Sequence, residues 1–140
     1  MNTLSKNEWE AQIDKVCALA RFFTTCNVID VSFESGHKME VYVALSETQR
    51  SQGLSRVSES QLPVDGMLFV FEKPSYAPFG MINMEMDLDI AWYDKSGKLI
   101  KFQTVPADYP VPICSPEPFS YVLEAPAGTL PRTNLKLTSG

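Results

Sequence analysis

The amino-acid sequence predicts a mostly β protein, with a β-sandwich or a barrel as the expected architecture. Six or seven short segments alternate apolar and polar residues or are apolar throughout, which is typical of strands. Turns that contain proline or glycine separate these segments, and two stretches have the pattern of a helix. The 140 residues, 44 % of them hydrophobic, are consistent with one folded domain.

The first helical pattern lies near the N-terminus. A capping box over Ser5–Glu8 precedes apolar residues that recur at helical spacing and form one stripe. We expect residues 1–26 to form this amphipathic helix and a connector, and residues 27–140 to form the β domain. The stripe must pack on that domain or on a protein partner. The candidate partner-binding residues on it are Trp9, Ile13, Val16 and Ala20.

Two alternating strands follow the helix. Apolar residues occupy every second position over 29–34 and again over 39–45, so each strand is expected to bury one face. The intervening Ser35–Lys38 has the length of a hairpin turn. His37 lies in this turn, where a solvent-exposed side chain is expected rather than a ligand-binding one.

A second, shorter helix and a buried strand come next. Ser46–Gln49 forms a capping box, and Gly53 suits the position just after a helix end. The polar residues 55–65 predict a loop. Gly66–Phe71 is continuously apolar, which predicts a strand buried on both faces.

The C-terminal half predicts the remaining strands and a long loop. The strands cover Leu88–Tyr93, Lys98–Val105, Ser120–Ala125 and a short last segment, Leu135–Leu137. Five prolines over 106–118 exclude a central strand and predict a stiff loop. Tyr109 in this loop is a further candidate partner-binding residue.

Charge and hydropathy limit the kinds of partner. A net charge of −5 and a pI near 4.8 oppose binding to phosphate backbones and anionic lipids, so we expect neither a nucleic-acid nor a membrane partner. The sequence has no apolar run long enough to span a bilayer and no features of a secretory signal. The expected location is the cytoplasm, or a particle assembled there.

The cysteines indicate neither a disulfide framework nor a zinc site. Cys17, Cys26 and Cys114 are widely spaced, and His37 is the single histidine. We therefore expect no metal and no cofactor. Idle thiols in a reducing compartment are the main interpretation, with a cysteine–histidine nucleophile as the alternative.

Asp89 is the most informative acidic residue, because its neighbours in the strand 88–93 are apolar. A buried carboxylate needs a cation or a hydrogen-bond donor. Arg50 and Arg56, on the short helix and just after it, are the candidates. The favoured interpretation is an ion pair that fixes this helix to the sheet, and a ligand-binding pair is the alternative. For Glu124, too, a structural ion pair is the favoured interpretation.

Six segments in register resemble a family of bacterial and archaeal proteins called domain of unknown function 192. They are Val41–Ala44, Arg50 with Gly53–Arg56, Gly66–Phe71, Phe79–Asn83, Leu88–Ile90 and Tyr121–Gly128. The similarity covers roughly residues 39–137. It implies a jelly-roll-like antiparallel β-sandwich, here with one N-terminal helix and one short internal helix. It implies no activity.

The chain departs from the family pattern at Ser55, where the family has methionine, and in the loop after the buried strand. That pattern reads Phe-Trp-Met-Lys-Asn-Thr, and Gly80, Ile82 and Met84 stand at its tryptophan, lysine and threonine positions. Met81 and Asn83 keep the family residues. The departures suggest a shared scaffold with an altered use.

Three functions are compatible with these observations. The first is a non-catalytic interaction module, an accessory subunit that docks onto a larger assembly such as a virus particle. The second is a domain that binds a small polar ligand or a carbohydrate. Its candidate residues are Arg50, Arg56, Met81, Asn83 and Asp89. The third is a hydrolase-like enzyme that uses Cys114 or a carboxylate.

Overall fold

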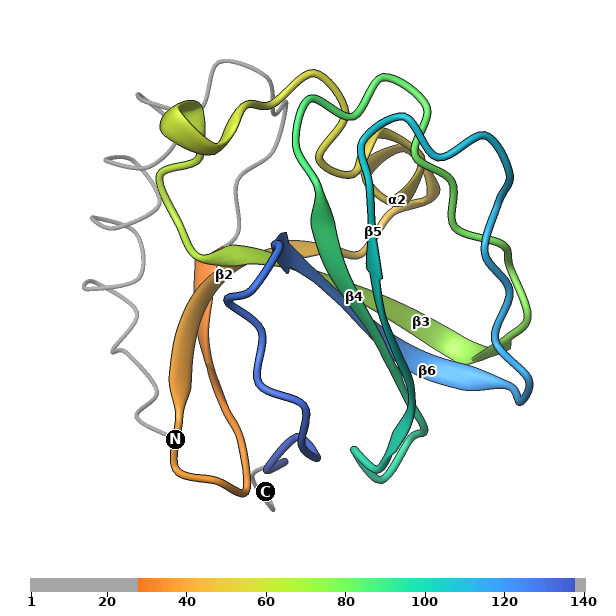
Figure 1. The fold of residues 1–140 in the computed structure, drawn as a ribbon. Helices are drawn as coiled ribbons and strands as arrows, with labels where there is room; N and C mark the ends of the chain where they lie inside the picture. The colour runs from red at the N-terminus through yellow and green to blue at the C-terminus, as the bar shows by residue number, and fades with distance from the viewer. Residues whose placement is uncertain (1–27, 138–140) are drawn as a thin grey trace.

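A computed structural model describes residues 28–137 of the chain (Figure 1). The helix expected over residues 1–26, with Trp9, Ile13, Val16 and Ala20, therefore lies outside the described residues. The described part is mostly β, as the sequence predicts. None of its helices is long and apolar enough to cross a membrane.

Six strands form the sheet. They are β1 (Val28–Ser32), β2 (Lys38–Ala44), β3 (Gly66–Ser75), β4 (Leu88–Tyr93), β5 (Leu99–Val105) and β6 (Phe119–Pro126). Their order across the sheet is β1-β2-β3-β6-β4-β5. The short helix α2 (Glu47–Gln52) and a 3₁₀ turn, η1 (Glu59–Gln61), lie between β2 and β3. Each of these strands corresponds to one expected from hydrophobic alternation or from an apolar run.

The expected antiparallel sandwich is wrong for the described residues, which form one mixed sheet. Strands β2 and β3 run parallel, with Val41 opposite Gly66 and Ala44 opposite Phe69. The connection over 45–65 crosses over with α2 and returns the chain in the same direction. Alternation indicates which side chains of a strand share a face. It does not determine which strands pair or in what direction.

Both faces of the sheet are buried. One face carries a large apolar cluster that includes Phe69, Trp92 and Val122. The short helix α2 contacts β2. The other carries a smaller cluster that includes Leu68 and Leu123. Neighbouring residues of β3 and β6 therefore point to opposite faces and are both covered, which explains why these strands are so apolar.

The C-terminal segment connects the two edges of the sheet. The Lys136 amide donates to the Ser32 carbonyl at the end of β1 (2.9 Å). The Leu135 amide donates to the Gly97 carbonyl (2.8 Å), and the Leu99 amide of β5 donates to Asn134 Oδ1 (2.8 Å). The last strand expected over 135–137 is reduced to a single bridge between Leu135 and Phe33. This segment therefore occupies backbone groups at the end of β1 and at the start of β5.

Candidate functional site

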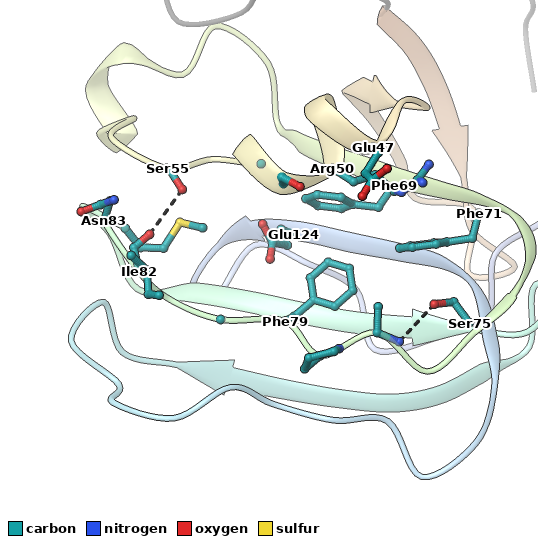
Figure 2. Close-up of a pocket in the computed structure, with 16 residues that line it drawn as sticks. Glu47, Arg50, Ser55, Phe69, Phe71, Ser75, Phe79, Ile82, Asn83 and Glu124 are labelled. Carbon is teal, nitrogen blue, oxygen red and sulfur yellow. Dashed lines mark hydrogen bonds between the residues drawn. The ribbon is translucent and has the colours of Figure 1, made fainter.

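A pocket of about 650 Å³ lies beside α2, on the face of the sheet with the larger apolar cluster (Figure 2). Its walls come from α2, β3, β6 and the loop over 75–84. Three phenylalanines supply much of the apolar surface: Phe69, Phe71 and Phe79. The polar lining residues are Glu47, Arg50, Ser51, Ser55, Ser75, Asn83 and Glu124. This volume and this mixture of rings with a few polar groups are typical of small-molecule sites.

The aromatic wall is held in place by packing and by the backbone. Phe79 meets Phe69 edge to face, with ring centroids 5.1 Å apart, and lies 6.2 Å from Phe71. A two-way bridge fixes the Phe79 backbone to Ile113, with N–O distances of 2.9 and 2.7 Å. The loop over 75–84 is therefore tied to the proline-rich loop, which gives the pocket a defined wall.

Gly53, directly after α2, allows close packing at one side of the pocket. Its φ angle is +48°, and a Cβ there would lie 3.2 Å from Phe69 Cζ and 3.7 Å from Glu124 Oε1. The positive φ angle confirms the sequence-based expectation that this glycine follows the helix end.

Replacing Gly53 by alanine should lower the free energy of unfolding by about 1–2 kcal/mol, because of the left-handed backbone and the contact with Phe69. Urea denaturation measures the change. Gly80→Ala is a matched control, since Gly80 also lines the pocket and a Cβ there meets nothing within 4 Å. Equal stability of the two variants would contradict the prediction.

Glu124 is the buried carboxylic acid of the pocket. It is 1 % exposed on β6, opposite Met67 of β3 and Ile90 of β4. Burial raises the pKa of its carboxyl to about 8, so the group is largely protonated at neutral pH. Its Oε1 atom has no hydrogen-bond partner among the described residues. Figure 2 shows Glu124 near the middle of the pocket, beside Phe79.

Arg50 lines the same pocket, but its guanidinium already has partners within the protein. Its Nη1 donates to the carbonyls of Leu45 and Val70, the latter at 3.2 Å. The guanidinium also lies over the Phe71 ring, 4.7 Å from its centroid. The contacts with Val70 and Phe71 fix α2 to the middle of β3.

Asp89 lies on the other side of the sheet, and its predicted ion pair is wrong. The carboxylate accepts hydrogen bonds from Thr104 Oγ1 (2.7 Å) and from three backbone amides after β6. Those amides belong to Gly128 (2.8 Å), Thr129 (3.1 Å) and Leu130 (3.1 Å). Within residues 28–137, no ion pair joins Asp89 to Arg50 or Arg56, because α2 packs on the opposite face. Asp89 instead fixes the turn after β6.

The other predicted ligand-binding residues are divided between the pocket and its surroundings. Asn83 is exposed and lines the pocket, with a positive φ angle of 61°. Arg56 is exposed nearby, and its amide donates to the Asn83 carbonyl (2.7 Å). Met81 is 3 % exposed and belongs to the apolar cluster rather than to the pocket lining. The structure thus brings Arg50 and Asn83 to one pocket and leaves Asp89 out of it.

Sequence reasoning missed Glu124 as a pocket residue, although a signal was present. In β6 this glutamate shares a face with Val122, which is fully buried. An acidic residue at an apolar position of a central strand indicates either a buried partner or a site. No sequence signal marks Phe69, Phe71 and Phe79 as pocket residues, because phenylalanine is expected in any hydrophobic core.

Comparisons with known proteins identify a family and a fold. The family model DUF192, described as "Uncharacterized ACR", matches residues 29–139. No curated protein matches the chain.

Two crystal structures are similar to the chain. One is a "putative transcription regulator" from Sinorhizobium meliloti, with 29 % identity and a TM-score of 0.66. The match covers 76 % of this chain and 89 % of that one. The other is a protein of unknown function from Novosphingobium aromaticivorans, with 24 % identity and a TM-score of 0.64. It covers 76 % of this chain and 79 % of that one, and at this identity it indicates the fold alone.

Proposed function

The chain belongs to the domain of unknown function 192 family, and from its own geometry we propose that it is a small-ligand-binding domain. The observation that carries the proposal is a buried carboxyl oxygen of Glu124, without a hydrogen-bond partner among the described residues, in a pocket of about 650 Å³. Burying a polar group without a partner costs free energy, so a core residue at this position would more favourably be apolar. A ligand that hydrogen bonds to Glu124 gives the residue a role.

The lining indicates the general character of this ligand. The rings of Phe69, Phe71 and Phe79 offer faces and edges to an apolar ring or chain. Ser55 and Asn83 lie at one end of the view in Figure 2, and Ser75 lies at the other, so a hydroxyl is present at each end and a side-chain amide at one. The ligand combines an apolar body with a hydrogen-bonding group.

The docking role predicted from sequence has less support. Four of its five residues lie outside the described range, and Tyr109 is 36 % exposed in the proline-rich loop. Val111 in the same loop is 52 % exposed. Isolated exposed apolar residues of this kind occur on most protein surfaces and do not identify a partner.

Neither DNA binding nor hydrolysis is favoured by a specific observation. The description of the Sinorhizobium meliloti protein suggests the former, but a net charge of −5 opposes contact with phosphates. For the latter, Cys114 is exposed in the proline-rich loop, whereas His37 lies in the turn after β1 against Phe33. The pocket therefore supports binding best.

The proposal predicts that single-ring fragments bind beside Glu124. Benzyl alcohol, benzylamine, benzoate and cyclohexanol can be titrated into labelled protein by NMR, with the resonances of Phe69, Phe79 and Glu124 as reporters. At least one fragment should shift them at millimolar concentration, since the pocket encloses more than one ring volume.

A pocket-narrowing variant sharpens this test. Gly80→Trp places a large ring at a lining position where a Cβ meets nothing within 4 Å, so folding should persist while the affinity falls by about tenfold or more. Val111→Trp adds the same ring at an exposed position outside the pocket lining and should leave the affinity unchanged. Absence of shifts for every fragment, or equal binding by both variants, would contradict the proposed function.

A further inference from the structure

The pocket places a hydrogen-bond acceptor among aromatic rings. Glu124 Oε1 is buried without a partner among the described residues, and Phe69 lies on the same side of the sheet. Phe79 packs edge to face on Phe69, so ring faces and edges border the same space. Aromatic faces attract cations, and a carboxylate attracts them more strongly.

The ionisable groups around the pocket can balance a positive ligand through Glu124. Among the described residues that line it, the ionisable side chains are Glu47, Arg50 and Glu124. With Glu124 ionised, their charges of −1, +1 and −1 leave a net charge of −1. The Arg50 guanidinium already serves two carbonyls and the Phe71 ring, which leaves it less suited to bind an anion.

We propose that the ligand carries a primary or secondary ammonium group on an apolar ring or chain, and that this group donates a hydrogen bond to Glu124. The inference rests on the proposed function, because it names the chemical class that the same pocket binds. A neutral hydroxyl could donate to Glu124, but the carboxyl would then stay protonated at pH 7 and no charge attraction would add to the hydrogen bond. A quaternary ammonium has no N–H group for the buried oxygen.

Binding of an ammonium group is coupled to loss of a proton. In the empty pocket the raised pKa keeps Glu124 protonated at pH 7, and an adjacent cation favours the carboxylate. The proton passes to the buffer, and no covalent bond forms other than that to the proton acceptor. The charged residues of α2 that line the pocket with Glu124 are Glu47 and Arg50, while its sheet neighbours Met67 and Ile90 are uncharged.

Isothermal titration calorimetry with benzylamine and benzyl alcohol tests this inference. Titrations at pH 7 in two buffers of different ionisation enthalpy give the number of protons released. Benzylamine should release up to one proton per molecule bound, because the raised pKa keeps Glu124 largely protonated in the empty pocket, and benzyl alcohol should release none. Benzylamine should also bind about tenfold or more tightly than the alcohol.

Two variants assign the effect to one side chain. Glu124→Gln should abolish both the proton release and the preference for the amine, with folding checked by circular dichroism. Glu72→Gln removes an exposed carboxylate of β3 outside the pocket lining and should preserve both.

The possible outcomes distinguish failure of the amine inference from failure of the proposed function. If benzyl alcohol binds at least as tightly and no proton is released, the amine inference is overturned and the proposed function stands. If neither probe binds at millimolar concentration, the amine inference is overturned, and the proposed function is overturned with it when benzoate and cyclohexanol also fail to bind. Proton release that persists in Glu124→Gln would overturn the role of this residue.

Discussion

Replacing Glu124 by glutamine is expected to raise the free energy of unfolding by roughly 3–5 kcal/mol above pH 8, because the buried carboxyl resists ionisation. Its pKa rises from 4.5 to about 8 on burial, so between these values the folded state keeps a proton that the unfolded state releases. The stability of the natural protein therefore falls as the pH rises through this window. Glutamine does not titrate, and below pH 4.5 the two proteins should differ little.

Urea unfolding at pH 4, 6, 7 and 9 measures this difference. The gap between Glu124→Gln and the natural protein should open steadily with pH and then become constant. Glu72→Gln, at an exposed position, should follow the natural protein at every pH. Parallel pH profiles for the natural protein and Glu124→Gln would show that the carboxyl is not buried in this way. A residue that weakens the fold at neutral pH is more readily explained by function than by stability.

Replacing Asp89 by alanine should lower the free energy of unfolding by roughly 3–5 kcal/mol. The carboxylate is 2 % exposed and accepts hydrogen bonds from the amides of Gly128, Thr129 and Leu130. Alanine would leave these donors buried or force the turn to open. Asp89→Asn should have an intermediate effect, since its amide nitrogen cannot accept a hydrogen bond.

Thr104→Val is the matched control for this prediction. It removes one of the four hydrogen bonds, a partly buried one, and should cost about 1 kcal/mol. Thermal and urea unfolding of the three variants give the ranking. A loss below about 1 kcal/mol for Asp89→Ala would show that the turn does not depend on this carboxylate.

The strands were predictable because burial imposes a period of two. The alternation over 29–34 and 39–45 corresponds to β1 and β2, and the apolar run from Gly66 corresponds to β3. The pairing of the strands was not predictable from this pattern. It depends on the crossover over 45–65, whose polar sequence indicates a loop and a short helix but not the direction of return.

The site was predictable only where a local pattern marked it. Arg50 and Asn83 are predicted ligand-binding residues, and both line the pocket. Asp89 was paired with the wrong partners because the residue number of an arginine does not indicate the face of the sheet on which it lies. The amides that hold Asp89 come about 40 positions later and have no side-chain signature.

The strand that carries Glu124 is the last of the six in the chain, yet it lies between β3 and β4. During synthesis on the ribosome, β1-β2-β3 and the β4-β5 hairpin emerge before β6, and in the sheet these two pieces do not pair with each other. The insertion of β6 joins these pieces and brings the glutamate under α2 in the same event. Residues 47–84 supply the rest of the pocket lining and precede β6 in the chain, so the pocket gains its buried carboxyl only when the last strand of the sheet is in place.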